Sequence, residues 1–508
     1  MKRSITPAQM KELETRFMQE NAVPGALLME HAAMGVADAV ARHVRRDGLC
    51  LFLCGPGNNG GDGYAAARLW AARGGRSQIV ELTSAAKGDA QLNRTLAQMA
   101  GIPISVFREN DHLPPCDGIV DALFGTGLTR YIDSPAAELI VSANHLSAKH
   151  GIPIIAVDIP SGIDGTTGRK RGAAIVATET VTFHRIKQGL LLDCAPNFTG
   201  KITVQPILIP TESPLDDEYA GLSVLEPADL SGDIFHRPQT CHKGDFGRVV
   251  LFCGSRGMAG AAALCANGAI RAGAGLTTIL CRESLLPILQ TLAPGAMCTV
   301  LPERDGALTP VAADIARTAL SRADAACIGC GLSPSADNLP LLRVFHEAAC
   351  PVVWDADALN LLAKTGDLPL KPADVITPHP GEAARLLGCT ADAVTADTLS
   401  ALRILHNKCG CTVLLKGARS LITNGRETFV NMHASPALAK GGSGDVLAGI
   451  ITALLGRRVT PLSSASAAAY GALIHGLAGV RAAKQHGENC TLPTDVVDCT
   501  RMDADGLD

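Results

Sequence analysis

Residues 49–70 read LCLFLCGPGNNGGDGYAAARLW. An apolar run passes into a glycine-rich turn and then into an alanine-rich segment, which is the pattern of a strand, a loop and a helix. Gly55, Gly57 and Gly60 have the spacing G-x-G-x-x-G of a dinucleotide-binding loop, and Glu81 lies where such a fold places its ribose-binding carboxylate. This stretch predicts a nucleotide-like ligand at a helix start, where backbone N–H groups favour phosphate.

The polar residues inside the turn do not fit an ordinary hydride-transfer enzyme. Asn58, Asn59 and Asp62 stand between the glycines and add amide and carboxylate oxygens, which suit hydroxyl groups or a hard cation. The turn therefore indicates a nucleotide without indicating hydride transfer. The alternative interpretation is a purely structural connection between a strand and a helix.

Length and composition exclude several classes of protein. The 508 residues suffice for two domains of about 220 to 270 residues or for three smaller ones. Aromatic residues make up only 3%, and alanine-rich segments alternate with Val, Ile and Leu runs, as in a buried α/β core. The net charge of −4 argues against nucleic acid or an anionic membrane as a partner. No run approaches the ~18 apolar residues of a membrane span.

The cysteines and the start of the chain indicate a compartment. The start, MKRSITPAQMKELETRF, lacks the apolar core of a secretory signal. The 17 cysteines are scattered without paired C-x-x-C sets, and many lie in apolar runs as small hydrophobic residues, among them Cys50, Cys54, Cys253 and Cys281. We therefore expect a reducing cytoplasm and no disulfide framework. Because no Cys/His group has ligand spacing, we expect no zinc site.

Two series of strand–loop–helix units follow one another along the chain. Continuous apolar runs predict buried parallel strands at 49–54, 78–82, 118–123, 154–158 and 202–208, and then at 276–281, 326–329, 351–354, 374–376 and 412–416. Residues 210–238 are acidic and rich in proline and predict a linker, after which GRVVLFCGSRGMAGAAALCANGAIRAG restarts the pattern. A helix is predicted at 444–455. The sequence thus predicts two α/β domains that bind ligands beyond the carboxyl ends of their strands.

Polar groups follow three strands of the first series. Asp121 lies late in one strand, before a Gly-Thr-Gly loop, and Asp158 and Ser161 follow another. A single Asp at a strand end is often only a turn former or a helix cap, but polar clusters at three strand ends predict a site. Asn59, Asp121 and Ser161 offer oxygens to one hard cation, and Asp158 is best placed for proton transfer.

The motifs GPGNNGGDGYAAARLW, DALFGTGL and DIPSGIDGTTG resemble the YjeF N-terminal domain, the NAD(P)H-hydrate epimerase family, over most of residues 1–215. The resemblance implies a Rossmann-like three-layer αβα domain, with Asp158 as the catalytic residue and a potassium ion at Asn59, Asp121 and Ser161. The hydrated nucleotide would bind at Asn58, Asn59, Gly60, Gly61, Asp62, Gly125, Thr126, Gly127, Leu128, Thr129, Arg130, Tyr131 and Asp158. Relatives of this fold also act as non-catalytic scaffolds in mRNA decay, but Asp158 beside an intact Asn-Gly loop favours the enzyme.

The second series ends in a distinct motif. ALAKGGSGDVLAGIITALL places Gly442, Ser443, Gly444 and Asp445 at the start of an amphipathic helix. Free N–H groups at a helix start bind an anion, and the positive helix end predicts an ionised Asp445 that acts as a base. The string gains specificity because it follows TVLLKGARSLI and VITPHPGEAARLL.

These motifs resemble the ribokinase superfamily, in which the G-x-G-D loop stabilises a transferring phosphate and its Asp deprotonates a hydroxyl. HPGE at 379–382 stands where sugar and vitamin kinases have N-x-x-E, and it marks the NAD(P)H-hydrate dehydratase branch, which the chain resembles over nearly all of residues 230–500. The resemblance implies a ribokinase-like αβα domain over 216–508. It would bind the hydrate at Ala262, Gly331, His379 and Asp445, and ADP at Lys416, Gly417, Ala418, Arg419, Ser420, Gly442, Ser443 and Gly444.

Some residues keep two interpretations. Without its HPGE context, His379 would be a loop histidine that caps the next helix. Asp355 and Asp357 either position substrate or cap a helix, and we leave them out of the catalytic set.

Together the resemblances imply one repair pathway. The first domain would interconvert the R and S hydrates of NADH and NADPH, and the second would dehydrate the S form with Asp445 as base, while ADP is hydrolysed to AMP and phosphate. We expect NADHX, NADPHX and ADP as partners, magnesium with ADP, a homo-oligomer, no nucleic acid and no membrane. Two alternatives stay open: a vitamin or sugar kinase fused to a nucleotide-binding regulator, and a scaffold whose first domain binds RNA. The choice between NADHX and NADPHX, and between ADP and ATP, also stays open.

Overall fold

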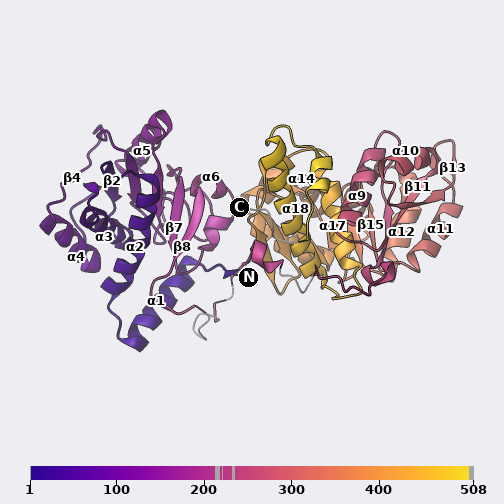
Figure 1. The fold of residues 1–508 in the computed structure, drawn as a ribbon, viewed down its shortest axis with the longest axis horizontal. Helices are drawn as coiled ribbons and strands as arrows, with labels where there is room; N and C mark the ends of the chain where they lie inside the picture. The colour runs from indigo at the N-terminus through magenta and orange to yellow at the C-terminus, as the bar shows by residue number, and fades with distance from the viewer. Residues whose placement is uncertain (1, 212–217, 220, 231–234, 503–508) are drawn as a thin grey trace. The chain divides into compact units, whose positions relative to one another are not determined.

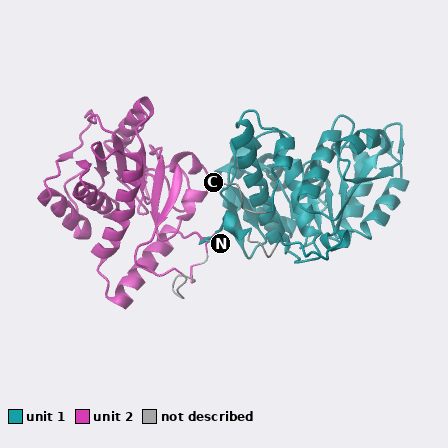
Figure 2. Ribbon diagram, viewed as in Figure 1, with its two compact units in different colours: residues 1–2, 223–508 teal, residues 3–222 magenta. Residues whose placement is uncertain are grey.

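The computed structural model describes residues 2–211, 218–219, 221–230 and 235–502 (Figure 1). The chain divides into two compact units: residues 3–222, here called the N-terminal unit, and residues 1–2 with 223–508, here called the C-terminal unit (Figure 2). The predicted boundary at 215/216 lies outside the described residues, as do residues 212–217, 220 and 231–234 of the predicted linker.

A parallel sheet forms the centre of the N-terminal unit, and its strands run in the order β4-β3-β2-β5-β6-β7-β8. The strands are β2 Leu49–Cys54, β3 Arg76–Glu81, β4 Ile104–Val106, β5 Gly118–Ala122, β6 Ile154–Val157, β7 Glu179–Phe183 and β8 Lys201–Gln205. The helices are α1 Pro7–Asn21, α2 Gly25–His43, α3 Asn58–Ala72, α4 Gly88–Met99, α5 Ala136–His150 and the short α6 Pro196–Thr199. All five strands predicted in this half are present; β4 and β7 were not predicted.

Alternate residues of each strand face opposite sides of this sheet. Phe52 and Val120 pack with side chains of α1, α2 and α3, whereas their neighbours Leu53 and Ile119 pack with side chains of α5. The result is the predicted three-layer arrangement. Numbered along the chain, the strand order is 3-2-1-4-5-6-7, so the connections reverse direction between β2 and β5. Ligands of such sheets bind in the crevice at this switch point.

The C-terminal unit contains a larger mixed sheet in the order β1-β9-β20-β19-β18-β17-β16-β15-β10-β11-β12. Its strands are β1 Lys2–Arg3, β9 Ser223–Leu225, β10 Arg248–Phe252, β11 Leu276–Arg282, β12 Met297–Leu301, β15 Ala325–Ile328, β16 Val352–Trp354, β17 Val375–Ile376, β18 Thr412–Leu415, β19 Ser420–Thr423 and β20 Thr428–Asn431, beside the hairpin β13 Glu303–Arg304 and β14 Ala307–Leu308. Its helices are α9 Ala259–Arg271, α10 Leu286–Leu292, α11 Val311–Leu320, α12 Leu339–His346, α13 Asp357–Thr365, α14 Pro380–Leu387, α15 Ala391–Ala396, α16 Thr398–Cys409, α17 Ser443–Leu455, α18 Ser464–His486 and α19 Pro493–Asp498.

The seven strands from β12 to β18 are parallel and repeat the order of the N-terminal unit, with the switch between β10 and β15. Beyond β18, two antiparallel strands extend the sheet. Helices α9, α17 and α18 cover one face, and α12 packs on the other, where the rings of Phe345 and Phe252 lie 6.2 Å apart. Each strand predicted in this half is present, and the helix predicted at 444–455 is α17. The predicted α/β class is therefore confirmed for both units.

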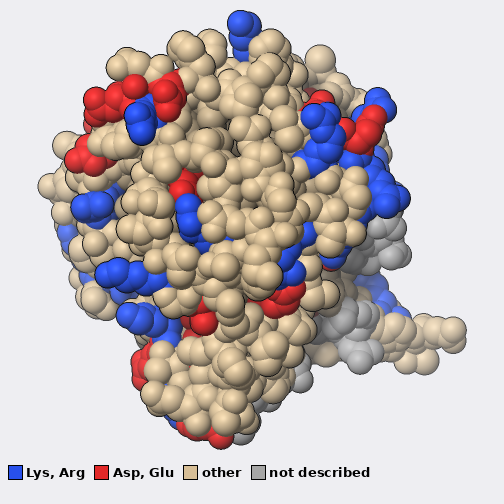
Figure 3. Space-filling model, turned by 90° about the vertical axis from the view of Figure 1, so that its left-hand side faces the viewer, with Lys and Arg blue, Asp and Glu red and all other residues tan. Residues whose placement is uncertain are grey.

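One face of the molecule shows how the charged side chains of the described residues are distributed (Figure 3). On the face shown in Figure 3, the Lys and Arg side chains of the described residues stand among acidic and uncharged ones and form no single continuous basic surface. Among the helices that the structure describes, none combines the length and the apolar character needed to cross a membrane.

Candidate active sites at the two switch points

The glycines of the opening loop have separable roles in the N-terminal unit. A Cβ on Gly55 would lie 1.8 Å from the carbonyl oxygen of Leu123, and one on Gly60 would lie 1.9 Å from the carbonyl oxygen of Gly55. Gly55 needs to be glycine because the loops after β2 and β5 touch at the switch point, and Gly60 because the turn after β2 packs on its own backbone. Gly57, in contrast, precedes α3 and faces open space. Part of the G-x-G-x-x-G pattern is thus packing, and Gly57 leaves room for a ligand at the helix start.

Glu81 is not a ribose-binding residue in this fold, which corrects the dinucleotide interpretation of the loop. Its carboxylate is fully buried and accepts two hydrogen bonds of 2.8 Å from Arg94 and one of 2.9 Å from the Tyr64 hydroxyl. Because α3 and α4 already occupy both of its oxygens, none is left for a sugar hydroxyl. Glu81 has the sequence spacing that the dinucleotide motif requires, but its side chain holds α3 and α4 to the sheet and does not face a ligand.

The three predicted cation ligands lie near one another around the start of the loop after β5. Asp121 is buried and accepts hydrogen bonds from the Ser161 amide at 2.7 Å and the Ser161 hydroxyl at 2.6 Å. Burial raises the pKa of Asp121 to about 6, although these hydrogen bonds oppose the shift. Asn59 lies against the same loop, since a Cβ on Gly125 would meet its Oδ1 at 2.7 Å. The Asn59 Nδ2 is buried without a hydrogen-bond partner among the described residues.

Asp158 is held in a strained backbone conformation at the end of β6. Its φ of +65° is in the left-handed region, which non-glycine residues seldom adopt and which is often found at functional sites. Its Oδ1 lies 2.7 Å from the ammonium of Lys187 and accepts a hydrogen bond of 2.9 Å from Thr182. Lys187 is itself buried and also donates to the carbonyl of Phe183 at 2.8 Å. The structure therefore pairs the predicted catalytic carboxylate with a buried cation.

Two further carboxyl groups lie in the same electrostatic environment. Burial raises the pKa of Glu14, while Lys187 opposes that shift and Asp158 adds to it. Burial also raises the pKa of Asp62 well above its usual value, with contributions from Asp158 and Glu14. Sequence reasoning missed Lys187 and Glu14, because neither belongs to a motif and both are more than 25 residues from Asp158 along the chain. A buried lysine near a carboxylate has no signal in a single sequence.

The remaining predicted residues of this site occupy the two loops at the switch point. Asn58, Gly60, Gly61 and Asp62 form the first turns of α3, and the loop from Gly125 to Leu128 follows β5. Thr129, Arg130 and Tyr131 lie at the exposed far end of that loop, where the ring of Tyr131 is 70% exposed. The structure thus brings the Asn-Gly loop to the Gly-Thr-Gly loop through the Asn59–Gly125 approach, and it leaves the last three residues at the surface.

In the C-terminal unit, the G-x-G-D motif begins α17 as predicted. Gly442 precedes the helix with a φ of +98°, a conformation that suits glycine. Ser443 is buried, and its hydroxyl lies 3.1 Å from Nε2 of His475 on α18. Burial lowers the pKa of His475 to about 4. A neutral imidazole therefore supports the turn that carries the predicted phosphate-binding amides.

The prediction of an ionised Asp445 is wrong, because burial outweighs the positive helix end. Burial raises the pKa of Asp445 to about 9, Cys330 and Asp355 add to the shift, and Lys416 opposes it. The loss of hydration outweighs the favourable potential at the start of α17, which is typically worth only about 0.3–1 kcal/mol. Once ionised, a carboxylate of raised pKa is a stronger proton acceptor than an exposed one.

Lys416 connects the predicted nucleotide loop to the acidic residues of the sheet edge. Its ammonium donates a hydrogen bond of 2.8 Å to Asp355, which also accepts one of 2.7 Å from the Thr377 hydroxyl. Glu382 of the HPGE motif lies 4.0 Å from the same ammonium. Asp355 thus lies among the predicted site residues. Asp357, the first residue of α13, accepts a hydrogen bond of 2.8 Å from the backbone amide of Ser333.

His379 serves as a helix cap, as the alternative interpretation held. Its Nδ1 accepts a hydrogen bond of 3.0 Å from the Gly381 amide at the start of α14, and its Nε2 lies 3.3 Å from Glu382. The side chain is still 51% exposed. Capping fixes the orientation of the ring without burying it, so the two interpretations are compatible.

The other predicted residues lie at the switch between β10 and β15 and at the β18–β19 turn. Ser255, after β10, donates a hydrogen bond of 2.9 Å to the carbonyl of Gly331, after β15. Gly331 has a φ of +59°, and a Cβ there would lie 2.6 Å from that of Ala261; the adjacent Ala262 is buried. Lys416, Gly417, Ala418, Arg419 and Ser420 form the turn from β18 into β19.

Comparisons with known proteins agree with this division. A family described as YjeF-related protein N-terminus matches residues 25–189, and a family described as NAD(P)H-hydrate dehydratase matches residues 249–501. A bifunctional NAD(P)H-hydrate repair enzyme of Moorella thermoacetica is 36% identical over 97% of this chain and 95% of its own. One of Escherichia coli is 38% identical over 88% of this chain and 83% of its own.

Among solved structures, an ADP/ATP-dependent NAD(P)H-hydrate dehydratase of Bacillus subtilis is 26% identical, with a TM-score of 0.46, over 52% of this chain and 91% of that one. The curated relatives are similar along nearly the full length of both units, so the comparison covers both switch points. The chain therefore belongs to the family of bifunctional NAD(P)H-hydrate repair enzymes.

Proposed function

We propose that the N-terminal unit epimerises the R and S hydrates of NADH and NADPH, and that the C-terminal unit dehydrates the S hydrate while ADP is hydrolysed. One observation carries the proposal. Each unit presents a carboxylate beside a glycine-rich helix start at the carboxyl edge of its sheet: Asp158 in the first and Asp445 in the second. The name of the family to which the chain belongs indicates the hydrated nucleotides as substrates and two activities in one chain.

In the first site, Asp158 moves the proton as the C6 centre of the hydrate opens and closes again. Lys187 acts as a positioning residue, because its ammonium fixes the Oδ1 of Asp158 at 2.7 Å. The N–H groups at the start of α3 and the loop from Gly125 to Tyr131 hold the nucleotide. The strained backbone at Asp158 supports this role, since such conformations are retained where function requires them.

A potassium ion fits the residues beside this site. Asn59, Asp121 and Ser161 provide one carboxylate and neutral oxygens, which is too little charge for a tightly bound divalent ion. The unpartnered side-chain amide of Asn59 supports the assignment, because an amide can turn its oxygen toward a cation. When bound, the ion would supply a fixed positive charge that orders the loops after β2 and β5. Asn59 lies against Gly125 of the loop after β5, and the hydroxyl of Ser161 accepts a hydrogen bond of 2.9 Å from the Phe124 amide of the same loop.

In the second site, Asp445 takes the proton of the C6 hydroxyl as its oxygen attacks the terminal phosphate of ADP and AMP leaves. Phosphate is a better leaving group than hydroxide. The phosphate on the C6 oxygen is therefore eliminated in the next step, which gives NAD(P)H. The backbone N–H groups of Gly442, Ser443 and Gly444 stabilise the charge that develops on the transferring phosphate. Magnesium would accompany ADP and neutralise its phosphates.

The binding surfaces of the second site follow its loops. Ala262 in the first turn of α9, Gly331 after β15 and His379 before α14 would contact the hydrate, because they follow strands at the same sheet edge as Asp445. Residues 416–420 would hold ADP, with Lys416 kept in place by its hydrogen bond to Asp355. The use of ADP rather than ATP, a homo-oligomeric state and a cytoplasmic location stay predictions.

The test uses the full chain with a mixture of R and S hydrates, ADP and potassium. Recovery of the dihydronicotinamide absorbance from the whole mixture, faster than spontaneous epimerisation, is expected. If only the S fraction recovers quickly, the epimerase assignment is wrong; if neither recovers, the dehydratase assignment is wrong. Accumulation of a phosphorylated product would instead support the kinase alternative.

A further inference from the structure

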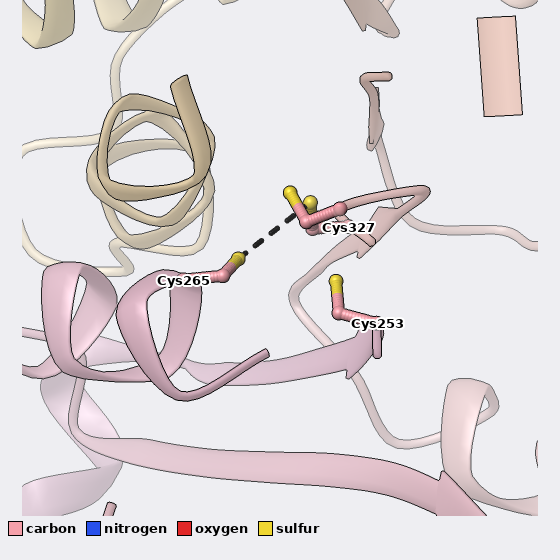
Figure 4. A group of neighbouring side chains, drawn as sticks. Cys253, Cys265 and Cys327 are labelled. Atoms are coloured by element: carbon pink, nitrogen blue, oxygen red, sulfur yellow. Dashed lines mark hydrogen bonds between the residues drawn. The ribbon is translucent and has the colours of Figure 1, made fainter. Parts of the chain in front are cut away.

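Four cysteines of the C-terminal unit converge in the interior next to the second site. The sulfur atoms of Cys253, Cys265, Cys327 and Cys330 all lie within 4.8 Å of one another, and all four side chains are fully buried. Figure 4 shows the sulfurs of the three labelled residues pointing toward one another. Among the described residues, no other group brings four metal-ligating side chains so close.

The four side chains come from separate elements. Cys253 follows β10, Cys265 lies on α9, Cys327 lies in β15 and Cys330 follows that strand. Cys327 and Cys330 have the spacing C-x-x-C, which is common among structural zinc ligands. The expectation of no zinc site rested on linear spacing, and it overlooked this pair as well as the two ligands that the fold adds from β10 and α9.

We propose that these four cysteines form a tetrahedral site for one zinc ion. Zinc–sulfur bonds of about 2.3 Å in a tetrahedron separate neighbouring sulfurs by about 3.8 Å. The Sγ atoms of Cys265 and Cys327 are 3.9 Å apart, so the group needs little adjustment to close around such an ion. Four thiolates select a soft ion such as zinc over magnesium, calcium or potassium, which prefer oxygen.

Two simpler interpretations compete with the zinc site. Buried cysteines also act as small hydrophobic residues, and these four lie within the main apolar core of the unit. Paired disulfides would join the sulfurs two by two, whereas here all four sulfurs lie within 4.8 Å of one another and each of the 17 cysteines is a free thiol. Packing does not require four sulfurs at one point, and a shared ligand does.

One of the four cysteines, Cys330, also lies next to the carboxylates Asp355 and Asp445 of the second site. The Cys330 sulfur is 3.8 Å from Oδ2 of Asp355, the residue that holds Lys416. An ion bound to Cys330 would fix the loop after β15, which also contains Gly331. We therefore expect the zinc ion to support the geometry of the second site and to take no part in its chemistry.

Complete burial determines how the site can be loaded. Zinc would enter before α9 packs onto the sheet, because none of the four proposed ligands is accessible in the folded chain. The full chain is therefore unfolded under reducing conditions with a chelator, and it is refolded with zinc, with cobalt or without metal. The double variant Cys265→Ala with Cys327→Ala removes two ligands, and Cys281→Ala with Cys298→Ala is the matched control from neighbouring strands.

The expected result is about one zinc ion per wild-type chain and per control chain, and at least a tenfold loss in the ligand variant. Cobalt should give thiolate charge-transfer bands and tetrahedral d–d bands only where the four cysteines are intact. The melting temperature should rise with zinc in the wild type and control alone. Metal-free refolding with the same melting temperature in zinc, or cobalt bands that survive in the ligand variant, would overturn the proposal.

Discussion

The two units have the same strand order but compensate the charge of their carboxylates differently. In the N-terminal unit, Asp158 directly follows the fifth strand of the sheet and lies 2.7 Å from a buried ammonium, that of Lys187. In the C-terminal unit, Asp445 follows an antiparallel extension of the sheet and begins a helix, while the nearby ammonium of Lys416 donates to Asp355. Asp445 is left with a pKa of about 9.

This difference shows that sheet order determines where a site can form and not how its residues ionise. Both carboxylates lie at the carboxyl edge, as the switch-point rule predicts. The cation near each one follows a strand that lies away from the switch point. Lys187 follows β7, and Lys416 follows β18. Replacing one partner at a time should therefore affect the two reactions separately.

The largest effect is expected from Asp445→Asn. Removing a positioned base typically slows a reaction by about 10²–10⁴-fold, so S-hydrate dehydration should fall by that amount. Epimer exchange, followed by NMR, should be unchanged because it depends on the other unit. Asp158→Asn is the reciprocal control and should abolish enzymatic exchange while dehydration of pure S hydrate continues. Equal losses of both activities in either variant would contradict the assignment of one reaction to each unit.

A smaller effect is expected from Lys187→Met, which removes the buried cation from Asp158. The carboxylate then loses its fixed position, and epimerisation should fall by about 10²-fold. Lys187→Arg should recover part of the rate because it restores the charge, which a simple loss of packing would not explain. Circular dichroism would verify that both variants fold. Normal epimerisation in Lys187→Met would remove this lysine from the site.

An intermediate effect concerns acid stability in the C-terminal unit. Burial lowers the pKa of His475 to about 4 from its ordinary 6.5, so the folded state binds a proton less readily than the unfolded chain. Above pH 6.5 the neutral imidazole does not reduce the free energy of unfolding. As the pH falls from 6.5 toward 4, the unfolded chain takes up a proton at His475 that the folded chain does not, and the free energy of unfolding decreases. In His475→Gln, the decrease in the free energy of unfolding between pH 7 and pH 4.5 should be smaller by about 2 kcal/mol.

Denaturant unfolding of the wild type and of His475→Gln at pH 7 and pH 4.5 would measure that difference. In the N-terminal unit, hydrogen bonds from Arg42 and other groups outweigh burial and lower the pKa of Glu179 to about 2. The stability that Glu179 provides is present above its ordinary pKa of 4.5 and is lost as the pH falls through 2. A substitution at His475 that left the pH dependence between 7 and 4.5 unchanged would show that the imidazole is accessible to protons in the folded state.

The smallest effect is expected from exchanging potassium for tetramethylammonium. Epimerisation should fall about tenfold, as is typical when the ligands around an ion are disturbed. Dehydration of pure S hydrate should change less, since the proposed ligands Asn59, Asp121 and Ser161 all belong to the N-terminal unit. Asp121→Asn should make epimerisation insensitive to the cation. Equal rates in the two salts with the wild-type chain would exclude a role for the ion.

Features encoded in short continuous segments were predictable from the sequence. The apolar runs predicted the central strands, and the segments around Gly57 and Gly442 predicted the starts of α3 and α17. The glycine at 442 reflects local backbone geometry, a φ of +98°, which is a property of neighbouring residues. The same local reasoning failed at Glu81, because the spacing of the motif contains no information about Arg94 and Tyr64, which occupy its carboxylate.

The sequence by itself determined the α/β class, the two series of strands and the loops that carry Asp158 and Asp445. Only the tertiary structure decided which charges meet: Lys187 beside Asp158, Lys416 on Asp355 rather than Asp445, and four cysteines from separate elements at one point. The reason is physical. Backbone conformation is set mainly between residues close in sequence, whereas burial, long-range hydrogen bonds and Coulomb interactions add over every segment that the fold brings near. The pKa of a buried group therefore depends on every segment packed around it and cannot be predicted from its motif alone.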